Sequence, residues 1–153
     1  MGWYRTVTND LSKLPSFIDY HDQQLTELRK DVAIRGSLEH NSARLPGLVE
    51  EVFRQLQEIE AVLKYIEIQN DVLTKKYFQK FLEGYNKQLS SRDAEKYANA
   101  EKEVVDNAII RNEVALIRNQ YLGLSKAYEA KGWQIGNITK LRCAGLDDSF
   151  IQD

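Results

Sequence analysis

Residues 46–67 read PGLVEEVFRQLQEIEAVLKYIE, and the spacing of their apolar side chains decides the fold. The apolar positions recur at alternating intervals of three and four residues, at Val49, Val52, Leu56, Ile59, Leu63 and Ile66. This period of about 3.5 residues is typical of a long helix that packs along another helix. Because proline suits the first turn of a helix, the pattern predicts a helix from Pro46 to about Leu82.

Asn70 occupies the next position of this seam, and Leu73 and Tyr77 continue it. A polar residue on such a seam would fix the register or the number of packed helices. Alternatively, Asn70 lies just beside the seam, because a straight helix drifts by about 20° per heptad. The sequence leaves both interpretations open.

A second long helix is predicted from Arg92 to about Lys131, with Gly132 as the residue that ends it. Its main seam consists of Ile110, Val114, Ile117, Tyr121, Leu124 and Tyr128. A second apolar stripe on the same helix contains Val105, Ile109 and Leu116. Two stripes on one helix call for two packing neighbours. The first long helix is one neighbour, and a copy of the chain is a candidate for the other.

The remaining segments predict shorter elements. One helix is expected over residues 15–35, ended by Gly36, and another over residues 138–144, capped by Asn137. We therefore predict an all-α fold with two long antiparallel helices plus shorter N- and C-terminal helices, assembling into a homo-oligomer. The expected divisions are an N-terminal extension with one helix over residues 1–36, a helical domain over residues 37–146, and a loose acidic tail over residues 147–153.

Composition sets broad limits on function. The chain has 153 residues with 21 basic and 23 acidic side chains, for a net charge of −2, which argues mildly against a generic nucleic-acid binder. A single cysteine, Cys143, excludes an intramolecular disulfide and suits a reducing cytoplasm. No apolar run approaches the roughly 18 residues that span a bilayer, so we expect a cytoplasmic protein with no membrane partner.

The sequence offers no convincing catalytic centre. His21 and His40 lie on different predicted segments, and Cys143 is expected to be a small buried hydrophobic side chain. Zinc would need three or four converging ligands, and no glycine-rich phosphate loop or nucleophile elbow is present. We predict that the protein is not an enzyme, with no catalytic residue, no metal and no cofactor.

Two basic stretches contain aromatic residues. Residues 71–92 hold five basic and two acidic side chains, and residues 126–142 hold four basic and one acidic. Cations that follow phosphates and rings that stack on bases fit single-stranded nucleic acid. The competing interpretation is structural: Tyr77, Phe81 and Tyr85 share one helix face and belong to a core, which leaves the lysines on an ordinary solvated face.

Several short motifs occur in a colinear order from Leu38 to Gly145. They are Ser42-x-Arg44-Leu45-Pro46-x-Leu48, Lys75-Lys76-Tyr77-Phe78-x-Lys80-Phe81-Leu82-x-Gly84, Tyr97-x-Asn99-Ala100-Glu101, Trp133-Gln134-Ile135-x-Asn137-Ile138 and Ala144-Gly145. This set resembles the UvsY family, the recombination mediators of T-even-type bacteriophages. The chain departs from the family pattern in residues 1–35, which look like an extension, and at Phe78, where the family has a basic residue.

The resemblance implies a non-enzymatic mediator in the cytoplasm of an infected bacterial cell. Such proteins form ring-like homo-oligomers, bind single-stranded DNA, and help a RecA-like (UvsX-type) recombinase displace the single-strand-binding protein. The residues it implies for DNA binding are Lys75, Lys76 and Lys80, then Lys87 and Arg92, with Tyr77 and Phe78 stacking on bases. Those expected to hold the oligomer together are Val114, Ile117, Tyr121, Leu124, Tyr128, Trp133 and Ile135. The alternative is a helical protein–protein interaction module, a phage inhibitor or structural adaptor, that binds no DNA.

Overall fold

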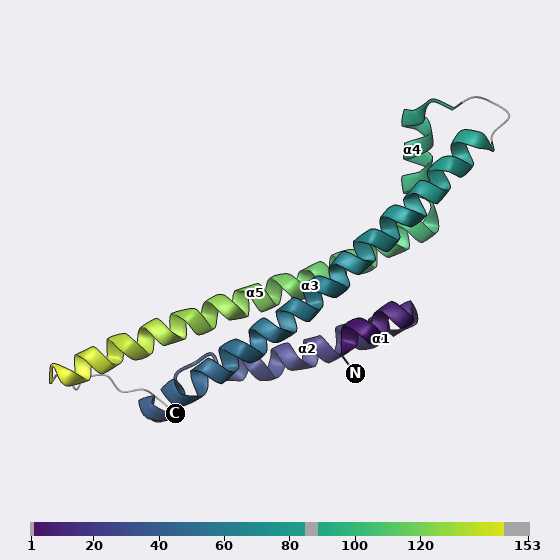
Figure 1. The fold of residues 1–153 in the computed structure, drawn as a ribbon. Helices are drawn as coiled ribbons and strands as arrows, with labels where there is room; N and C mark the ends of the chain where they lie inside the picture. The colour runs from purple at the N-terminus through teal and green to yellow at the C-terminus, as the bar shows by residue number, and fades with distance from the viewer. Residues whose placement is uncertain (1, 85–88, 146–153) are drawn as a thin grey trace.

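The computed structural model describes residues 2–84 and 89–145, and every regular element within these ranges is helical. The predicted all-α class with two long helices is therefore confirmed. In chain order the elements are α1 (Trp3–Asn9), the short 3-10 helix η1 (Leu11–Lys13), α2 (Leu14–Lys30), α3 (Leu38–Glu83), α4 (Ser91–Ala100) and α5 (Lys102–Cys143) (Figure 1).

Helices α3 and α5 form a long antiparallel hairpin, and α2 lies along one side of it (Figure 1). Three contacts fix the direction of α2. His21 meets Tyr121, the Leu28 carbonyl meets Tyr128, and the Asp31 carbonyl meets Lys131. Since these contacts advance together along both helices, α2 runs parallel to α5 and antiparallel to α3.

The molecule divides into a thick part and a thin part. We call residues 3–70 and 110–143 the body, where α1, α2, α3 and α5 share one apolar core. We call residues 71–84 and 89–109 the arm, which consists of the end of α3, α4 and the start of α5. The end of α3 and α4 enclose a small cluster of Phe81, Ala94 and Ala98. Figure 1 shows the arm extending away from the body, with α4 beside the end of α3.

The seam predicted on α3 is buried in the body from Val52 to Ile66, whereas Val49 is 44% exposed. The side-chain carbonyl of Asn70 is buried and has no hydrogen-bond partner among the described residues. The side chain of Asn70 therefore points inward at the end of the body core.

Pro46 does not open α3, as the sequence predicted, but lies inside it, because the chain is capped earlier. The Ser37 hydroxyl accepts a hydrogen bond from the His40 backbone N–H at 3.1 Å. The side-chain amide of Asn41 donates to the carbonyls of Arg35 and Ser37, at 2.6 and 2.7 Å. These bonds start the helix at Leu38.

The helix predicted over residues 92–131 is instead two helices, because Glu101 adopts an extended conformation with φ −63° and ψ 137°. The predicted stop at Gly132 and the separate helix over residues 138–144 are also wrong, since α5 continues to Cys143. Gly132 faces α3 so closely that an added Cβ would lie 3.3 Å from Leu45 Cδ2. Close packing against α3 therefore explains this glycine within the helix.

The N-terminal segment contains more structure than the single helix predicted. Pro15 lies in the first turn of α2 as expected, but α2 ends at Lys30, and α1 and η1 precede it. Val7 of α1 is fully buried in the body core, so the extension shares its core with the rest of the chain. The predicted tail over residues 147–153 lies outside the described residues.

Candidate nucleic-acid interface on the arm

Three lysines predicted to contact phosphates lie together on the arm. Lys75, Lys76 and Lys80 are all exposed on the last turns of α3, beyond the body core. Lys76 and Lys80 are one turn apart and therefore share a face of the helix, with Lys75 beside them. The structure thus presents three ammonium groups to solvent on one short segment.

The aromatic residues beside them have a divided role. Tyr77 and Phe78 are half-buried and pack against the small arm cluster. The Lys80 ammonium lies 5.6 Å from the centre of the Tyr77 ring, within the range of a cation–π contact. Desolvation raises the pKa of Tyr77, and the nearby Glu103 carboxylate adds to this effect. These rings support the arm core, and only the part of each ring that stays exposed is open to a ligand.

Helix α4 brings a further basic residue to the same arm. Arg92 is exposed in its first turn, and the Tyr97 ring packs against Phe81 with 5.5 Å between centres. The sequence analysis missed Lys96, which is exposed one turn after Arg92. Lys87, another predicted contact, lies outside the described residues.

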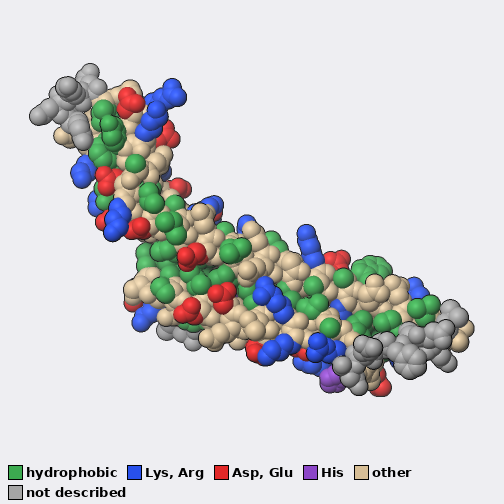
Figure 2. Space-filling view, turned by 180° about the vertical axis from the view of Figure 1, so that it is seen from behind, with side chains coloured by type: hydrophobic (Ala, Val, Ile, Leu, Met, Phe, Trp, Pro, Cys, Tyr) green, Lys and Arg blue, Asp and Glu red, His purple; other side chains and the backbone are tan. Residues whose placement is uncertain are grey.

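Acidic side chains outnumber basic ones among the described residues of the arm, by seven to six. Asp93 and Glu95 are exposed on α4, so this helix carries as many acidic as basic residues. Figure 2 shows lysine and arginine side chains interleaved with aspartate and glutamate along the arm. Any phosphate contact therefore depends on individual lysines and not on a continuous basic surface.

The seam predicted to hold copies together lies instead in the core of one chain. Its members are buried by α2 and α3, and they are Val114, Ile117, Tyr121, Leu124 and Tyr128. The Tyr128 hydroxyl donates to the Leu28 carbonyl at 2.5 Å. Ile135 is also buried, whereas Trp133 is 71% exposed. Of the seven residues, only Trp133 faces solvent.

A buried polar network crosses the body. His21 Nδ1 lies 3.0 Å from the Tyr121 hydroxyl, which donates to Gln55 Oε1, and Gln55 Nε2 donates to Glu51. With Tyr121 donating to Gln55, the His21 Nδ1–H is the donor to Tyr121. Burial lowers the pKa of His21 to about 4, and burial raises the pKa of Tyr121. The network joins α2, α3 and α5 through the side chains of His21, Tyr121 and Gln55, and it ends at the Glu51 carboxylate, whose pKa is lowered by the hydrogen bond from Arg54.

Lys131 binds backbone carbonyl groups that follow the end of α2. Its ammonium donates to the Asp31 carbonyl at 2.6 Å and to the Ala33 carbonyl at 3.5 Å. Burial lowers the pKa of this lysine. Neither His21 nor Lys131 carried a recognisable sequence motif, because their partners lie about a hundred residues away in the chain.

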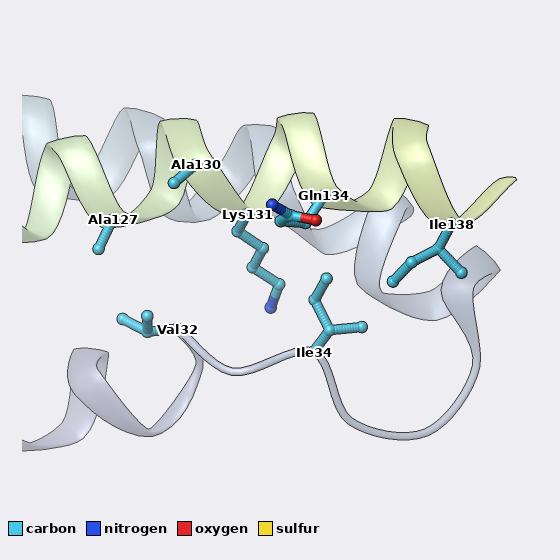
Figure 3. Close-up of a pocket in the computed structure, with 7 residues that line it drawn as sticks. All are labelled: Val32, Ile34, Ala127, Ala130, Lys131, Gln134 and Ile138. Atoms are coloured by element: carbon cyan, nitrogen blue, oxygen red, sulfur yellow. The ribbon is translucent and has the colours of Figure 1, made fainter. Parts of the chain in front are cut away.

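Two apolar grooves of about 540 Å³ each flank the second half of α5. One lies between α5 and the α2–α3 connection (Figure 3), and its lining residues are Val32, Ile34, Ala127, Ala130, Lys131, Gln134 and Ile138. The other is lined by Leu45, Pro46, Val49, Glu50, Phe53 and Ser125.

The described part of the chain contains no group of three or more His, Cys, Asp and Glu side chains placed to hold a metal ion. Cys143 is exposed at the end of α5, which corrects the expectation that it is buried. None of the described helices combines the length and the apolar character needed to cross a membrane.

Comparisons with models of known protein families, with curated proteins and with solved structures found no match.

Proposed function

We propose that the protein is a recombination mediator that binds single-stranded DNA through its arm. The observation that carries this proposal is the exposure of Lys75, Lys76 and Lys80 beside the half-buried rings of Tyr77 and Phe78. Exposed cations contact a phosphate backbone, and aromatic rings stack on bases without regard to sequence. The motif resemblance to the UvsY family supplies the mediator role.

The proposed mechanism rests on weak, repeated contacts. One arm offers few cations and several carboxylates, so a single chain binds a strand weakly. Copies held in a ring-like homo-oligomer would engage the same strand at several points, and avidity would then raise the overall affinity by orders of magnitude. A RecA-like, UvsX-type recombinase could displace such contacts one at a time as it replaces the single-strand-binding protein in the infected bacterial cell.

Fluorescence anisotropy of a labelled single-stranded oligonucleotide tests the DNA contact. Binding at about 50 mM salt should weaken by orders of magnitude at about 300 mM, because phosphate contacts release counterions. The triple variant Lys75→Gln/Lys76→Gln/Lys80→Gln should lose most of the affinity. Lys13→Gln/Lys30→Gln/Lys64→Gln removes the same charge from exposed lysines of the body and should bind as the wild type does. Equal losses in both variants would contradict a site on the arm.

A second assay tests the mediator role. ATP hydrolysis by a UvsX-type recombinase should be slow on DNA coated with single-strand-binding protein and should rise when the wild-type protein is added. The arm variant should not produce this rise. If the wild type binds DNA but leaves the recombinase rate unchanged, the protein is a DNA-binding protein without mediator activity.

One observation favours the alternative function, a protein–protein interaction module without DNA binding. The charges of α4 cancel, while large apolar side chains are exposed along both long helices, including Phe53 and Leu116. This alternative predicts that the arm lysines can be replaced without any loss, and that no oligonucleotide binds even at about 50 mM salt.

A further inference from the structure

An uncharged stripe runs along the outer face of α5. It contains Val105, Ile109, Asn112, Leu116, Asn119, Gly123, Ala127, Ala130 and Gln134. We call these nine residues the α5 outer stripe. Their spacing of three or four residues places them on one helix face, and they extend over about 44 Å. No charged residue interrupts the stripe, although charged residues are frequent elsewhere on α5.

The stripe is open to solvent in the single chain. Val105, Ile109 and Leu116 are 40, 52 and 58% exposed, and of the nine residues only Ala127 is half-buried. Helices α2 and α3 cover the seam of Tyr121 and Leu124 on another face of α5. The second apolar stripe seen in the sequence is therefore the one that lacks a neighbour among the described residues.

Large and small residues are separated along the stripe. The large apolar residues Val105, Ile109 and Leu116 lie in its first half, and the small residues Gly123, Ala127 and Ala130 lie in its second half. The positions are also symmetric about the midpoint between Asn119 and Gln120. When two copies of α5 are laid antiparallel about that midpoint, Leu116 faces Gly123 and Ile109 faces Ala130.

The groove of Figure 3 completes this complementarity. It opens beside Ala127, Ala130 and Gln134, with Val32 and Ile34 as its opposite wall. In the antiparallel arrangement, Ile109 and Val105 of the second copy reach this part of the stripe. Large apolar side chains thus meet a groove floored by small ones, the ridge-into-groove arrangement that packs helices closely.

The exposed area is sufficient for such a contact. The chain exposes 10429 Å², and a standard protein interface buries roughly 1,600 Å² in total, about 800 Å² from each copy.

We propose that the α5 outer stripe pairs antiparallel with the same stripe of a second copy about a two-fold axis near Asn119. The contact is isologous, so each copy contributes the large half and the small half once. This pair would be the first step in forming the homo-oligomer on which the proposed DNA binding rests. It implies an even number of copies.

Gly123→Arg is the decisive variant. An added Cβ at Gly123 meets nothing within 4 Å in the single chain, and replacing a helical glycine favours the helix, so the monomer should fold at least as well. In the pair, the new side chain meets Leu116 of the second copy. Gly136→Arg makes the same change on the same helix away from the stripe, where a Cβ also meets nothing within 4 Å.

Light scattering after size exclusion measures the molar mass of the protein without any DNA. The experiment therefore distinguishes a failure of this pairing from a failure of DNA binding. We expect the wild type and Gly136→Arg at an even multiple of 17.7 kDa, and Gly123→Arg at half their mass with an unchanged helical circular dichroism spectrum. A monomeric wild type, an odd number of copies, or an unchanged mass for Gly123→Arg would overturn the proposal.

Cysteine cross-linking in a Cys143→Ser background tests the direction of pairing. Ile109→Cys/Ala130→Cys should form a disulfide-linked dimer, and Ile109→Cys alone should not. A parallel pair would give the opposite result for the single variant, because each residue would then face its own copy.

Discussion

The body and the arm are built from the same two helices, yet they are held together differently. In the body, α3 and α5 meet a third layer, and fully buried side chains such as Phe17, Ile59 and Tyr121 fill the core. In the arm, the buried cluster consists of Phe81 and two alanines. Apolar burial contributes about 25 cal/mol per Å², so most of the folding free energy comes from the body. Substitutions at the proposed DNA site on the arm should therefore leave the body folded.

The largest difference in the free energy of unfolding is expected between two tyrosine substitutions. Tyr121→Ala should lower the free energy of unfolding by about 3–5 kcal/mol, because it leaves a cavity and removes the partner of His21 and Gln55. Tyr97→Ala on the arm, where the ring is 51% exposed, should cost about 1 kcal/mol or less. Urea unfolding followed by circular dichroism measures both, and equal costs would contradict the division into body and arm.

The next prediction concerns pH and the body alone. His21 has a folded pKa of about 4, below its ordinary value of 6.5, so the unfolded chain binds the proton more readily. The contribution of His21 to the free energy of unfolding should be fully present above pH 6.5. It should fall by about 2–3 kcal/mol as the pH drops from 6.5 to 4. His21→Phe should flatten this part of the profile. His40→Asn, at an exposed histidine, is the matched variant for comparison.

Two equivalent helix caps give a smaller and sharper comparison. Ser37 accepts from the His40 N–H at 3.1 Å, and Ser90 accepts from the Asp93 N–H at 3.2 Å. Ser37→Ala should reduce global stability by about 1 kcal/mol. Ser90→Ala removes the corresponding bond and also the bond from the Ser90 hydroxyl to the Asp93 carboxylate at 2.7 Å. It should mainly increase amide hydrogen exchange in α4, because the arm opens locally. A full loss of global stability from Ser90→Ala would show that the arm and the body unfold together.

The smallest effect is expected from the arm lysines. Lys75→Gln/Lys76→Gln/Lys80→Gln should change the unfolding free energy by less than about 0.5 kcal/mol, because these side chains are exposed. A thermal melt measures this directly. A larger loss would mean that the lysines support the fold, and reduced DNA binding by the same variant would then lose its simple interpretation.

The sequence predicted the helices better than their ends and neighbours. Apolar periodicity located both long helices, since Val52 to Ile66 and Val114 to Tyr128 are buried. Proline and glycine were less reliable as signals of where a helix begins or ends, because capping and tertiary packing override the local preference at Pro46 and Gly132.

The seam on α5 was recognised and the first long helix was expected beside it, but the contribution of α2 was not. The pattern around Tyr121 and Leu124 is equally compatible with a second copy and with another helix of the same chain. Which of these covers it depends on α2, and no periodicity in residues 14–30 specifies that α2 runs parallel to α5. The candidate lysines lie on an exposed face, whereas the sequence analysis did not consider Lys96 and the acidic residues of α4 that lie on the same arm.

The parallel docking of α2 also has a consequence for the order of folding. Its polar contacts with α5, from His21–Tyr121 to Asp31–Lys131, each close a loop of about a hundred residues. On the ribosome, α2 is complete long before α5 emerges, at about 5–20 residues per second, so it must wait several seconds for its site. We infer that the hairpin of α3 and α5 forms first and that α2 docks last. A slow step in refolding should then report on α2, and Tyr128→Phe should mainly speed unfolding and leave the rate of hairpin formation unchanged.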